Sequence, residues 1–362
     1  MTAAAPTPTK VAPRPINVAI AITMGDPAGI GPEIIAKAFL QAPLETRHCF
    51  VVGDVATLRR ACALVAKDHI GLPTLVLDTV DQALNLPEKC LPVLQVGELS
   101  RPVKYGEMSG FSGKISAQCV ISAANAALRG EVAAIVTAPL HKEALAMAGA
   151  PHNAFPGHTE MLQALAAAHG GKTVAQMPVR MMLANDELRV VLVSIHMALS
   201  EALAAVTFDR VLQTLQIAHQ SLWAMLGHAP RIGVAGLNPH AGEGGRFGRE
   251  EIEVIAPAIA AARTQGINAS GPFAPDTVFM RARHTPAKPG EFDVVIAMYH
   301  DQGLIPVKYL GVEKGVNVTL GLPLVRTSPD HGTAFDIAGL GIADPSSLIE
   351  SIRMARKLAV QN

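Results

Sequence analysis

The sequence is poor in several residue types, and each shortage narrows the possible functions. Aromatic residues make up 4% and charged residues 17% of the 362 residues. The 30 basic and 30 acidic side chains cancel, so charge gives no reason to expect nucleic acid or a membrane as a partner. The four cysteines (Cys49, Cys62, Cys90 and Cys119) have no CxxC spacing. We therefore expect them to be structural thiols of a cytoplasmic protein.

Long apolar runs are also missing. The segment INVAIAIT follows Lys10 and Arg14 and could be mistaken for the core of a signal peptide. Its apolar part spans about eight residues, far fewer than the ~20 of a membrane helix, and it leads into a glycine-rich motif instead of a cleavage site. We interpret it as the first strand of the fold. Residues 1–15 before it are rich in Ala, Pro and Thr, which predicts a disordered tail.

What the chain does contain is 49% apolar residues, arranged as short strand-like runs that alternate with helical segments. This alternation predicts an α/β sheet. Helical spacing predicts helices over residues 110–130, 208–227 and 346–360, and two apolar runs over 178–196 predict a hairpin. The length suits two domains. Because no linker is visible, we expect the two domains to be interleaved.

Residues 297–345 carry polar groups at the ends of their apolar runs, which strands that only pack a core do not need. The cations Lys308 and Arg326 and the neutral donor Asn317 lie in this region. Arginine binds phosphate or carboxylate through a fork of donors, and lysine acts as a compact charge or, when desolvated, as an acid or base. The region therefore predicts one wall of an active site for a small anion; solvated surface charges are the alternative.

Three histidines, His196, His240 and His300, each follow an apolar strand. Ligand sites of open α/β sheets gather at the carboxyl ends of strands. Three imidazoles there can hold a divalent ion and leave positions open for substrate. Their spacing matches no local metal motif, so capping or core histidines remain the alternative.

Two further places suggest ligand binding. His158 and Thr159 follow Pro-Gly and begin a helix, where free backbone N–H groups can bind an anion; an N-cap is the other interpretation of Thr159. The glycine-rich turn MGDPAGIGPE contains Asp26 and could bind an anion or be a tight turn without a ligand. His141 and Lys142 begin another predicted helix, and a role in starting that helix is the simplest interpretation of the two.

Several motifs together resemble one family. They are MGDPAGIGPE, PGHTE, GLNPHAGEGG, MYHDQG and GVNVTLGLPLVRTSPDHGTAFDIAG. In this order they are similar to the 4-hydroxythreonine-4-phosphate dehydrogenase family, over nearly all of the chain after the tail. The segment HGTAFDIAGLGIADPSS also resembles the adenosine-binding segment of isopropylmalate and isocitrate dehydrogenases.

The resemblance implies roles for individual residues. It implies that His196, His240 and His300 bind one divalent metal ion, such as Zn, Mg or Co. It places the phosphorylated substrate against His158, Thr159, Lys308, Asn317 and Arg326. It places the adenosine half of NAD or NADP against His331, Gly332, Thr333, Ala334 and Asp336, with Asp336 near the ribose.

The implied reaction is oxidation of the secondary alcohol of 4-hydroxythreonine 4-phosphate, followed by decarboxylation to 3-amino-2-oxopropyl phosphate in pyridoxal phosphate biosynthesis. Lys308 is the expected catalytic residue, because the pKa of a buried ammonium group shifts readily. Some relatives instead oxidise threonate or erythronate 4-phosphate. The complete phosphate-binding set argues against a third branch, which oxidises an aromatic dihydrodiol. A metabolite-binding protein without catalysis is the alternative of another class, and the three histidines and Lys308 argue against it.

The resemblance also implies the architecture. We expect a three-layer α/β/α fold of the isocitrate and isopropylmalate dehydrogenase type, with the active site between two interleaved subdomains. The first would comprise residues 16–140 with 305–362, and the second residues 141–304. The family forms homodimers whose active sites are shared between subunits. No role is predicted for the tail or for residues 163–178.

Overall fold

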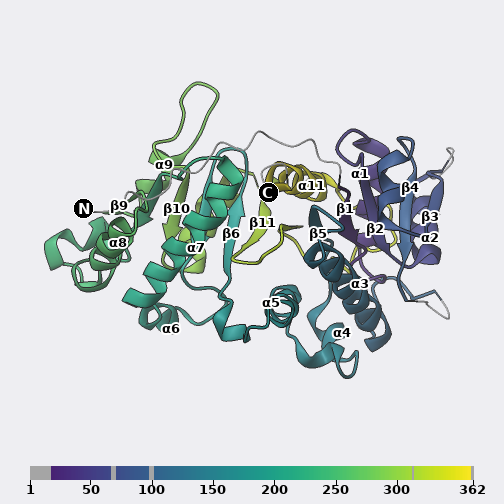
Figure 1. The fold of residues 1–362 in the computed structure, drawn as a ribbon, viewed down its shortest axis with the longest axis horizontal. Coiled ribbons are helices and arrows are strands. Elements are labelled where there is room, and N and C mark those ends of the chain that lie inside the picture. The colour runs from purple at the N-terminus through teal and green to yellow at the C-terminus, as the bar shows by residue number, and fades with distance from the viewer. Residues whose placement is uncertain (1–17, 67–70, 98–101, 312–313, 360–362) are drawn as a thin grey trace, which may run out of the picture.

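A single twelve-stranded sheet runs through the whole molecule (Figure 1). The computed structural model describes residues 18–66, 71–97, 102–311 and 314–359; the tail predicted for residues 1–15 lies outside them. In sheet order the strands are β3 (Thr74–Leu77), β4 (Leu91–Gln95), β2 (Cys49–Gly53), β1 (Ile20–Thr23), β5 (Ala134–Thr137), β12 (Arg326–Pro329), β11 (Val316–Leu320), β6 (Arg180–Ala184), β7 (Arg189–Leu192), β10 (Val294–Ala297), β8 (Ile232–Ala235) and β9 (Ala269–Phe273).

The strand directions divide this sheet into two halves. The strands from β3 to β12 run parallel to one another, as do those from β7 to β9. Between the halves, β12–β11, β11–β6 and β6–β7 are antiparallel pairs. These three reversals make the two halves run in opposite directions. The carboxyl ends of the two parallel halves therefore lie at opposite edges of the sheet.

Helices cover both faces of the sheet, which confirms the predicted three-layer α/β/α fold. The helices are α1 (Gly31–Gln41), α2 (Val55–Ala66), α3 (Gly110–Leu128), α4 (Lys142–Ala146), α5 (His158–His169), α6 (Leu199–Ala204), α7 (Phe208–Leu226), α8 (Ala256–Thr264), α9 (Val278–Ala282), α10 (His300–Tyr309) and α11 (Ser346–Ala359). Thr327 of β12 donates a hydrogen bond to the Ser351 carbonyl of α11 at 2.8 Å. Because side chains alternate along a strand, its neighbour Arg326 points to the face opposite α11.

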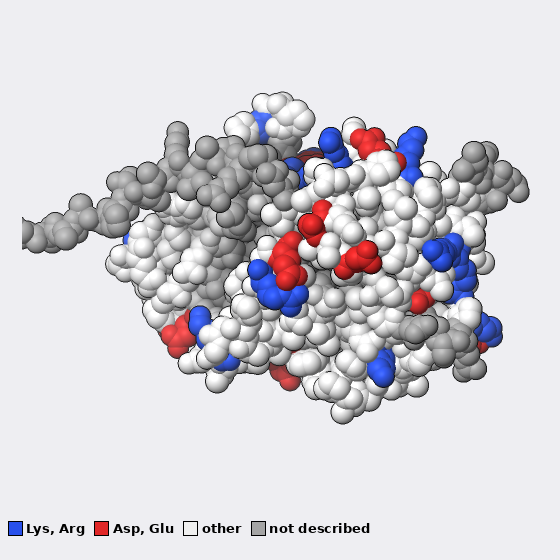
Figure 2. Space-filling model, turned by 45° about the vertical axis from the view of Figure 1, so that its right-hand side comes forward, with Lys and Arg blue, Asp and Glu red and all other residues white. Residues whose placement is uncertain are grey.

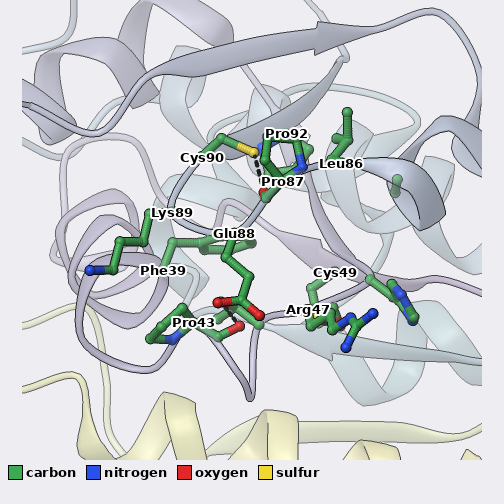
Figure 3. A pocket seen from close by; sticks show the side chains of 13 residues that line it. Phe39, Pro43, Arg47, Cys49, Leu86, Pro87, Glu88, Lys89, Cys90 and Pro92 are labelled. Carbon is green, nitrogen blue, oxygen red and sulfur yellow. Dashed lines mark hydrogen bonds between the residues drawn. The ribbon is translucent and has the colours of Figure 1, made fainter.

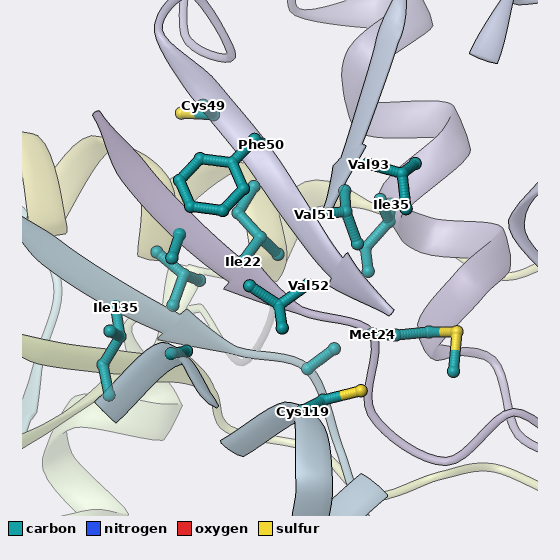
Figure 4. Close-up of a cluster of buried hydrophobic side chains, with 14 of the residues drawn as sticks. Ile22, Met24, Ile35, Cys49, Phe50, Val51, Val52, Val93, Cys119 and Ile135 are labelled. Carbon is teal, nitrogen blue, oxygen red and sulfur yellow. The ribbon is translucent and has the colours of Figure 1, made fainter. Parts of the chain in front are cut away.

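The buried apolar residues form one large core in the half that contains β1, two on the two faces of the half that contains β10, and a small fourth cluster of Ala166, Ala167 and Met177. In the first core, Ile22 of β1 and Phe50 and Val52 of β2 are buried side chains of two adjacent strands (Figure 4). Strands β1 and β2 are buried along their whole length, as parallel strands covered on both faces must be. Leu145 and Met161 also belong to this first core, although residues 141–304 are predicted as the second subdomain. The subdomain boundaries remain predictions.

Most sequence-based elements are confirmed. The predicted helix over residues 110–130 is α3, and the predicted hairpin is the antiparallel pair β6–β7. Strand β9 contains Pro272. Among the described strands, β9 is at the edge of the sheet and pairs with β8 alone, and an edge is where a sheet tolerates proline.

The four cysteines are buried and free, as expected for structural thiols. Acidic and basic side chains are interspersed on the face of the molecule shown in Figure 2, in keeping with the balanced composition. Among the described residues, no helix is both long and apolar enough to cross a membrane.

Candidate active site

Two of the three predicted metal ligands lie side by side. Strands β7 and β10 are parallel neighbours, with Leu192 paired to Ala297, so the residues after each strand come together. The ring centroids of His196 and His300 are 5.5 Å apart. Both line a cavity of about 250 Å³. Burial, followed by the positive charges of Lys142 and His300, lowers the pKa of His196; neutral imidazole is the form that binds metals.

The third predicted ligand, His240, lies in a loop with unusual backbone geometry. From His240 to Gly244 five consecutive residues have positive φ, between 42° and 77°. The ring of His240 lies 6.4 Å from that of Phe247. Within the described ranges, no three His, Cys, Asp or Glu side chains are close enough together to hold a metal ion. The chain thus brings His196 and His300 together, and the role of His240 stays a prediction.

Arg326 is a buried cation on the face of the sheet opposite α11. Only 4% of it is exposed. Its Nε and Nη2 atoms donate to Thr137 Oγ1 at 3.1 and 2.7 Å, and Nη1 donates to Thr319 Oγ1 at 3.1 Å. Burial lowers its pKa to about 10, an effect that the negative charge of Glu160 opposes. Arg326 is therefore charged at neutral pH.

Arg326 has more hydrogen-bond donors than the described side chains use. Guanidinium has five N–H donors, and three hydrogen bonds from Arg326 are found among the described side chains. No carboxylate of the described residues forms an ion pair with it. Arg326 and Thr319 also border a cavity of about 610 Å³, whose lining includes Lys172, Met225 of α7 and Leu358 of α11 but neither His158 nor Asn317. A buried charge is stable only when paired, so this geometry suits an anionic ligand.

His158 belongs to the same neighbourhood. It is the first residue of α5. The N-cap residue before it is Gly157, which has no side chain to cap the helix. Its Nε2 atom is buried and has no hydrogen-bond partner in the described structure. Burial, then the positive charges of Arg326 and Lys142, hold the pKa of His158 well below its usual value. Thr159 is the second residue of α5, so the interpretation of Thr159 as an N-cap is wrong.

Asn317 and Lys308 lie farther along the same face. Asn317 of β11 is opposite Ser328 of β12, and residues two apart on a strand share a face, so Asn317 is on the side of Arg326. The Lys308 Nζ atom, at the end of α10, lies 2.8 Å from Asp330 Oδ2. The Lys308 side chain is 38% exposed. The expectation that Lys308 is desolvated therefore does not match its surroundings, and its catalytic role stays a prediction.

The predicted cofactor segment packs against the glycine-rich turn. The Thr333 carbonyl accepts a hydrogen bond from Ile30 N at 3.0 Å. A Cβ atom at Gly29 would lie 2.9 Å from that same carbonyl oxygen, so this close approach requires glycine. The Phe335 ring stacks on His141 at 4.8 Å. Of the predicted contacts, His331, Gly332 and Asp336 are exposed, whereas Thr333 is buried and Ala334 half-buried.

Asp26 and His141 have structural partners. Asp26 is fully buried and accepts hydrogen bonds from Ala28 N at 2.9 Å and Ser112 Oγ at 3.4 Å. Burial raises its pKa despite these bonds. His141 caps α4 by accepting a hydrogen bond from Ala144 N, which confirms the simple interpretation of its place in the sequence.

Sequence reasoning missed several residues of this site. Thr137 and Thr319 hold Arg326, Asp330 pairs with Lys308, and Lys142 lies close enough to lower the pKa of both His158 and His196. Threonine inside a β-rich run is so ordinary that no local signal distinguishes it. In the sequence, Lys142 stands out only as the start of a predicted helix.

A separate small cavity lies in the first half, beside Cys49 and Cys90 (Figure 3). Its volume is about 20 Å³, room for about one water molecule. Cys90 Sγ donates to the Pro87 carbonyl at 3.0 Å, and burial raises the pKa of Cys49 to about 12. Neither thiol is placed for catalysis.

The chain was compared with known proteins. Residues 45–355 match the family model described as "Pyridoxal phosphate biosynthetic protein PdxA". A 4-hydroxythreonine-4-phosphate dehydrogenase of Beijerinckia indica is 51% identical over 94% of this chain and 95% of its own length. A D-threonate 4-phosphate dehydrogenase of Pectobacterium atrosepticum is 43% identical over 94% of this chain and 99% of its own length.

A solved structure gives the same assignment. The crystal structure of 4-hydroxythreonine-4-phosphate dehydrogenase from Klebsiella pneumoniae has a TM-score of 0.82 and 42% identity, covering 94% of this chain and 99% of that one. Fold and sequence therefore agree over almost the whole length. The chain belongs to the pyridoxal phosphate biosynthetic protein PdxA family.

Proposed function

We propose that this protein oxidises 4-hydroxythreonine 4-phosphate at its secondary alcohol, in pyridoxal phosphate biosynthesis. The proposed products are 3-amino-2-oxopropyl phosphate and carbon dioxide. The observation that carries the proposal is Arg326, a buried cation with unused donors and no carboxylate partner among the described residues, next to the unpartnered Nε2 atom of His158. An anionic substrate group would satisfy both. We assign His158, Thr159, Lys308, Asn317 and Arg326 to substrate binding.

The fixed donors of the site would orient the substrate. Arg326 is held at Thr137 and Thr319 before any ligand arrives, so little rotamer freedom is lost on binding. His158 is kept neutral by burial and by nearby cations, so it can donate one hydrogen bond from whichever ring nitrogen carries the proton. The backbone N–H groups at the start of α5, near Thr159, add donors for the same anion.

The paired imidazoles fit a divalent ion. His196 and His300 are adjacent, and His300 Nδ1 lies 2.7 Å from Asp301 Oδ1, a carboxylate contact that orients a metal-binding imidazole. We propose that His196, His240 and His300 hold one Zn, Mg or Co ion. Such an ion supplies Lewis acidity at the alcohol oxygen, which lowers the pKa of the alcohol. Because the described residues of one chain bring only two of the three histidines together, we propose a homodimer with shared active sites.

The remaining groups complete the reaction. NAD or NADP, placed against His331, Gly332, Thr333, Ala334 and Asp336, is the proposed hydride acceptor. Exposed Asp336 near the ribose would disfavour the second phosphate of NADP. Lys308, linked to Asp330, is the proposed proton carrier. The ketone formed lies β to the substrate carboxylate, so carbon dioxide leaves readily. The carbon atom that keeps the electrons of the broken bond then takes up a proton. We place the reaction in the cytoplasm, with neither nucleic acid nor membrane as partner.

A second candidate keeps the chemistry and changes the substrate. A relative named D-threonate 4-phosphate dehydrogenase is 43% identical to this chain. Threonate 4-phosphate has a hydroxyl group where 4-hydroxythreonine 4-phosphate has an amine, and the phosphate-binding residues would serve both. Erythronate 4-phosphate is a further substrate of this type.

A substrate panel tests these proposals. Purified protein would be given 4-hydroxythreonine, threonate or erythronate 4-phosphate, with NAD or NADP and with Zn, Mg or Co, and cofactor reduction followed by absorbance. We expect the highest kcat/KM with 4-hydroxythreonine 4-phosphate. Higher kcat/KM with either sugar-acid phosphate would favour the second candidate. Absence of cofactor reduction in every combination would contradict catalysis, and full activity in metal-free protein would remove the metal from the mechanism.

A further inference from the structure

Glu251 is a buried acidic residue that has no role in the proposed reaction. It is 3% exposed and begins the π-helix Glu251–Ile255. We propose that Glu251 is a positioning residue that fixes the loop carrying His240. The inference rests on the proposed role of His240 as a metal ligand and adds the residue that holds this ligand in place.

The Glu251 carboxylate fastens the start of that loop. Its Oε1 atom accepts hydrogen bonds from the backbone N–H groups of Leu237 and Asn238, both at 2.7 Å. Its Oε2 atom accepts from Asn238 Nδ2 at 3.0 Å. Two residues later the chain reaches His240. The carboxylate therefore determines the direction in which the chain enters the loop.

The loop requires such an anchor because its own conformation is unfavourable. His240, Ala241 and Glu243 all have positive φ, at 54°, 53° and 42°. The left-handed conformation is unfavourable for a non-glycine residue, and strain of this kind persists only where surrounding contacts enforce it. The loop makes an unbroken left-handed turn from His240 to Gly244.

Glu251 also touches the far side of the turn. A Cβ atom at Gly242 would lie 2.7 Å from Glu251 Oε2, and one at Gly236 would lie 3.0 Å from Oε1. The carboxylate thus fills the inside of the loop, between its start and its apex. Glycine at position 242 allows this close approach and also tolerates the local φ of +77°.

A carboxylate is required here for a definite reason. Both oxygens accept hydrogen bonds at once, Oε1 from two N–H groups and Oε2 from an amide. In Glu251→Gln one of these oxygens becomes an N–H₂ donor that faces another donor. The side chain keeps its shape, but the hydrogen bonds accepted by one of the two oxygens are lost. We therefore expect the imidazole of His240 to lose its fixed position without loss of the fold.

Titration of the metal-free, full-length protein with Co²⁺ alone tests the inference. We expect Glu251→Gln to weaken Co²⁺ binding by about 10- to 100-fold, the usual effect of losing an outer support of a metal ligand, and to change the visible absorption of bound Co²⁺. A purely structural residue would alter the thermal midpoint and leave that spectrum unchanged. The matched control is Glu253→Gln on the same helical segment, where Glu253 is exposed and pairs with Arg249 at 2.5 Å; it should bind Co²⁺ as the wild type does.

Two further variants separate the possible failures. If Glu251→Gln does not fold, Gly242→Ala places a methyl group against the same carboxylate and should weaken Co²⁺ binding too. If His240→Ala weakens binding but folded Glu251→Gln keeps the wild-type affinity and spectrum, the inference is overturned and the metal site stands. If His240→Ala binds Co²⁺ as the wild type does, the proposed ligand role of His240 fails, and the inference fails with it.

Discussion

Arg326 and Lys308 are two cations on the same side of the central strands, and their surroundings differ sharply. Arg326 is 4% exposed and held by two threonine hydroxyls. Lys308 is 38% exposed and paired with Asp330 at 2.8 Å. The lysine is neutralised within the chain, whereas the arginine keeps a net charge away from water. The arginine, which has no carboxylate partner among the described residues, therefore points more strongly to an anion from outside than the lysine does.

The substitution Arg326→Met should have the largest effect on catalysis. Loss of the guanidinium group should lower kcat/KM for the phosphorylated substrate about 1000-fold, because removing one partner of a buried charge pair costs several kcal/mol. The unfolding free energy of the ligand-free protein should rise, by about 1 kcal/mol, because an unpaired buried charge disappears. Steady-state kinetics and urea denaturation measure the two effects.

The control for that variant is Arg180→Met. Arg180 is also held by a threonine hydroxyl, at 2.7 Å from Thr214, and burial lowers its pKa to about 10. It is only half-buried, however, and it also donates to the Val179 carbonyl at 2.9 Å and to Gln213 Oε1 at 2.8 Å. Kinetic constants close to those of the wild type are expected for Arg180→Met. Equal kinetic losses in the two variants would mean that Arg326 acts through the fold and not on substrate.

Lys308→Met should have the next largest effect and the opposite effect on stability. We expect kcat to fall about 100-fold, the usual range for a lost proton carrier, with little change in KM. Asp330, whose side chain is 12% exposed, would lose its cation, so the unfolding free energy should fall by about 1 kcal/mol. Unchanged kcat with a raised KM would show that Lys308 only binds substrate.

Thr137→Val should produce a smaller kinetic change. This nearly isosteric replacement removes the acceptor of two Arg326 hydrogen bonds, at 3.1 and 2.7 Å. The guanidinium would remain but lose its orientation, so KM should rise about tenfold. Phosphate protection of the protein against thermal unfolding gives an independent measure. Wild-type KM in Thr137→Val would mean that the threonine does not orient the arginine.

The last prediction concerns His158 and the pH dependence of stability. Burial keeps this imidazole neutral in the folded protein, whereas the unfolded chain binds a proton below its ordinary pKa of about 6.5. Stability is therefore unaffected above pH 6.5 and falls as the pH drops below it, by about 1.4 kcal/mol per pH unit until the lower folded-state pKa is reached. Urea denaturation of wild type and His158→Asn at pH 7.5 and 5.5 should show the larger loss in the wild type. Parallel losses would place His158 in contact with solvent.

The same contrast shows what the sequence could reveal. Periodicity predicted α3, α7 and the β6–β7 hairpin because each depends on local patterning. Arg326 was also found, because an arginine after an apolar run is unusual. Thr137 and Thr319 were not, since strands β5, β11 and β12 meet only through long-range pairing that no local pattern encodes. Strand β9 was missed because proline argues against a strand until its place at the sheet edge is known.

The four buried thiols have a practical consequence. Cys49, Cys62, Cys90 and Cys119 are all inaccessible, and burial raises the pKa of each, so few thiolates are present to react with maleimides. The native protein should thus behave toward such dyes as though it had no cysteine. One new cysteine at exposed Lys104 and another at exposed Arg281 would place a fluorophore on each half of the sheet. Energy transfer between them could then report any relative motion of the halves when substrate binds, with no native thiol to remove first.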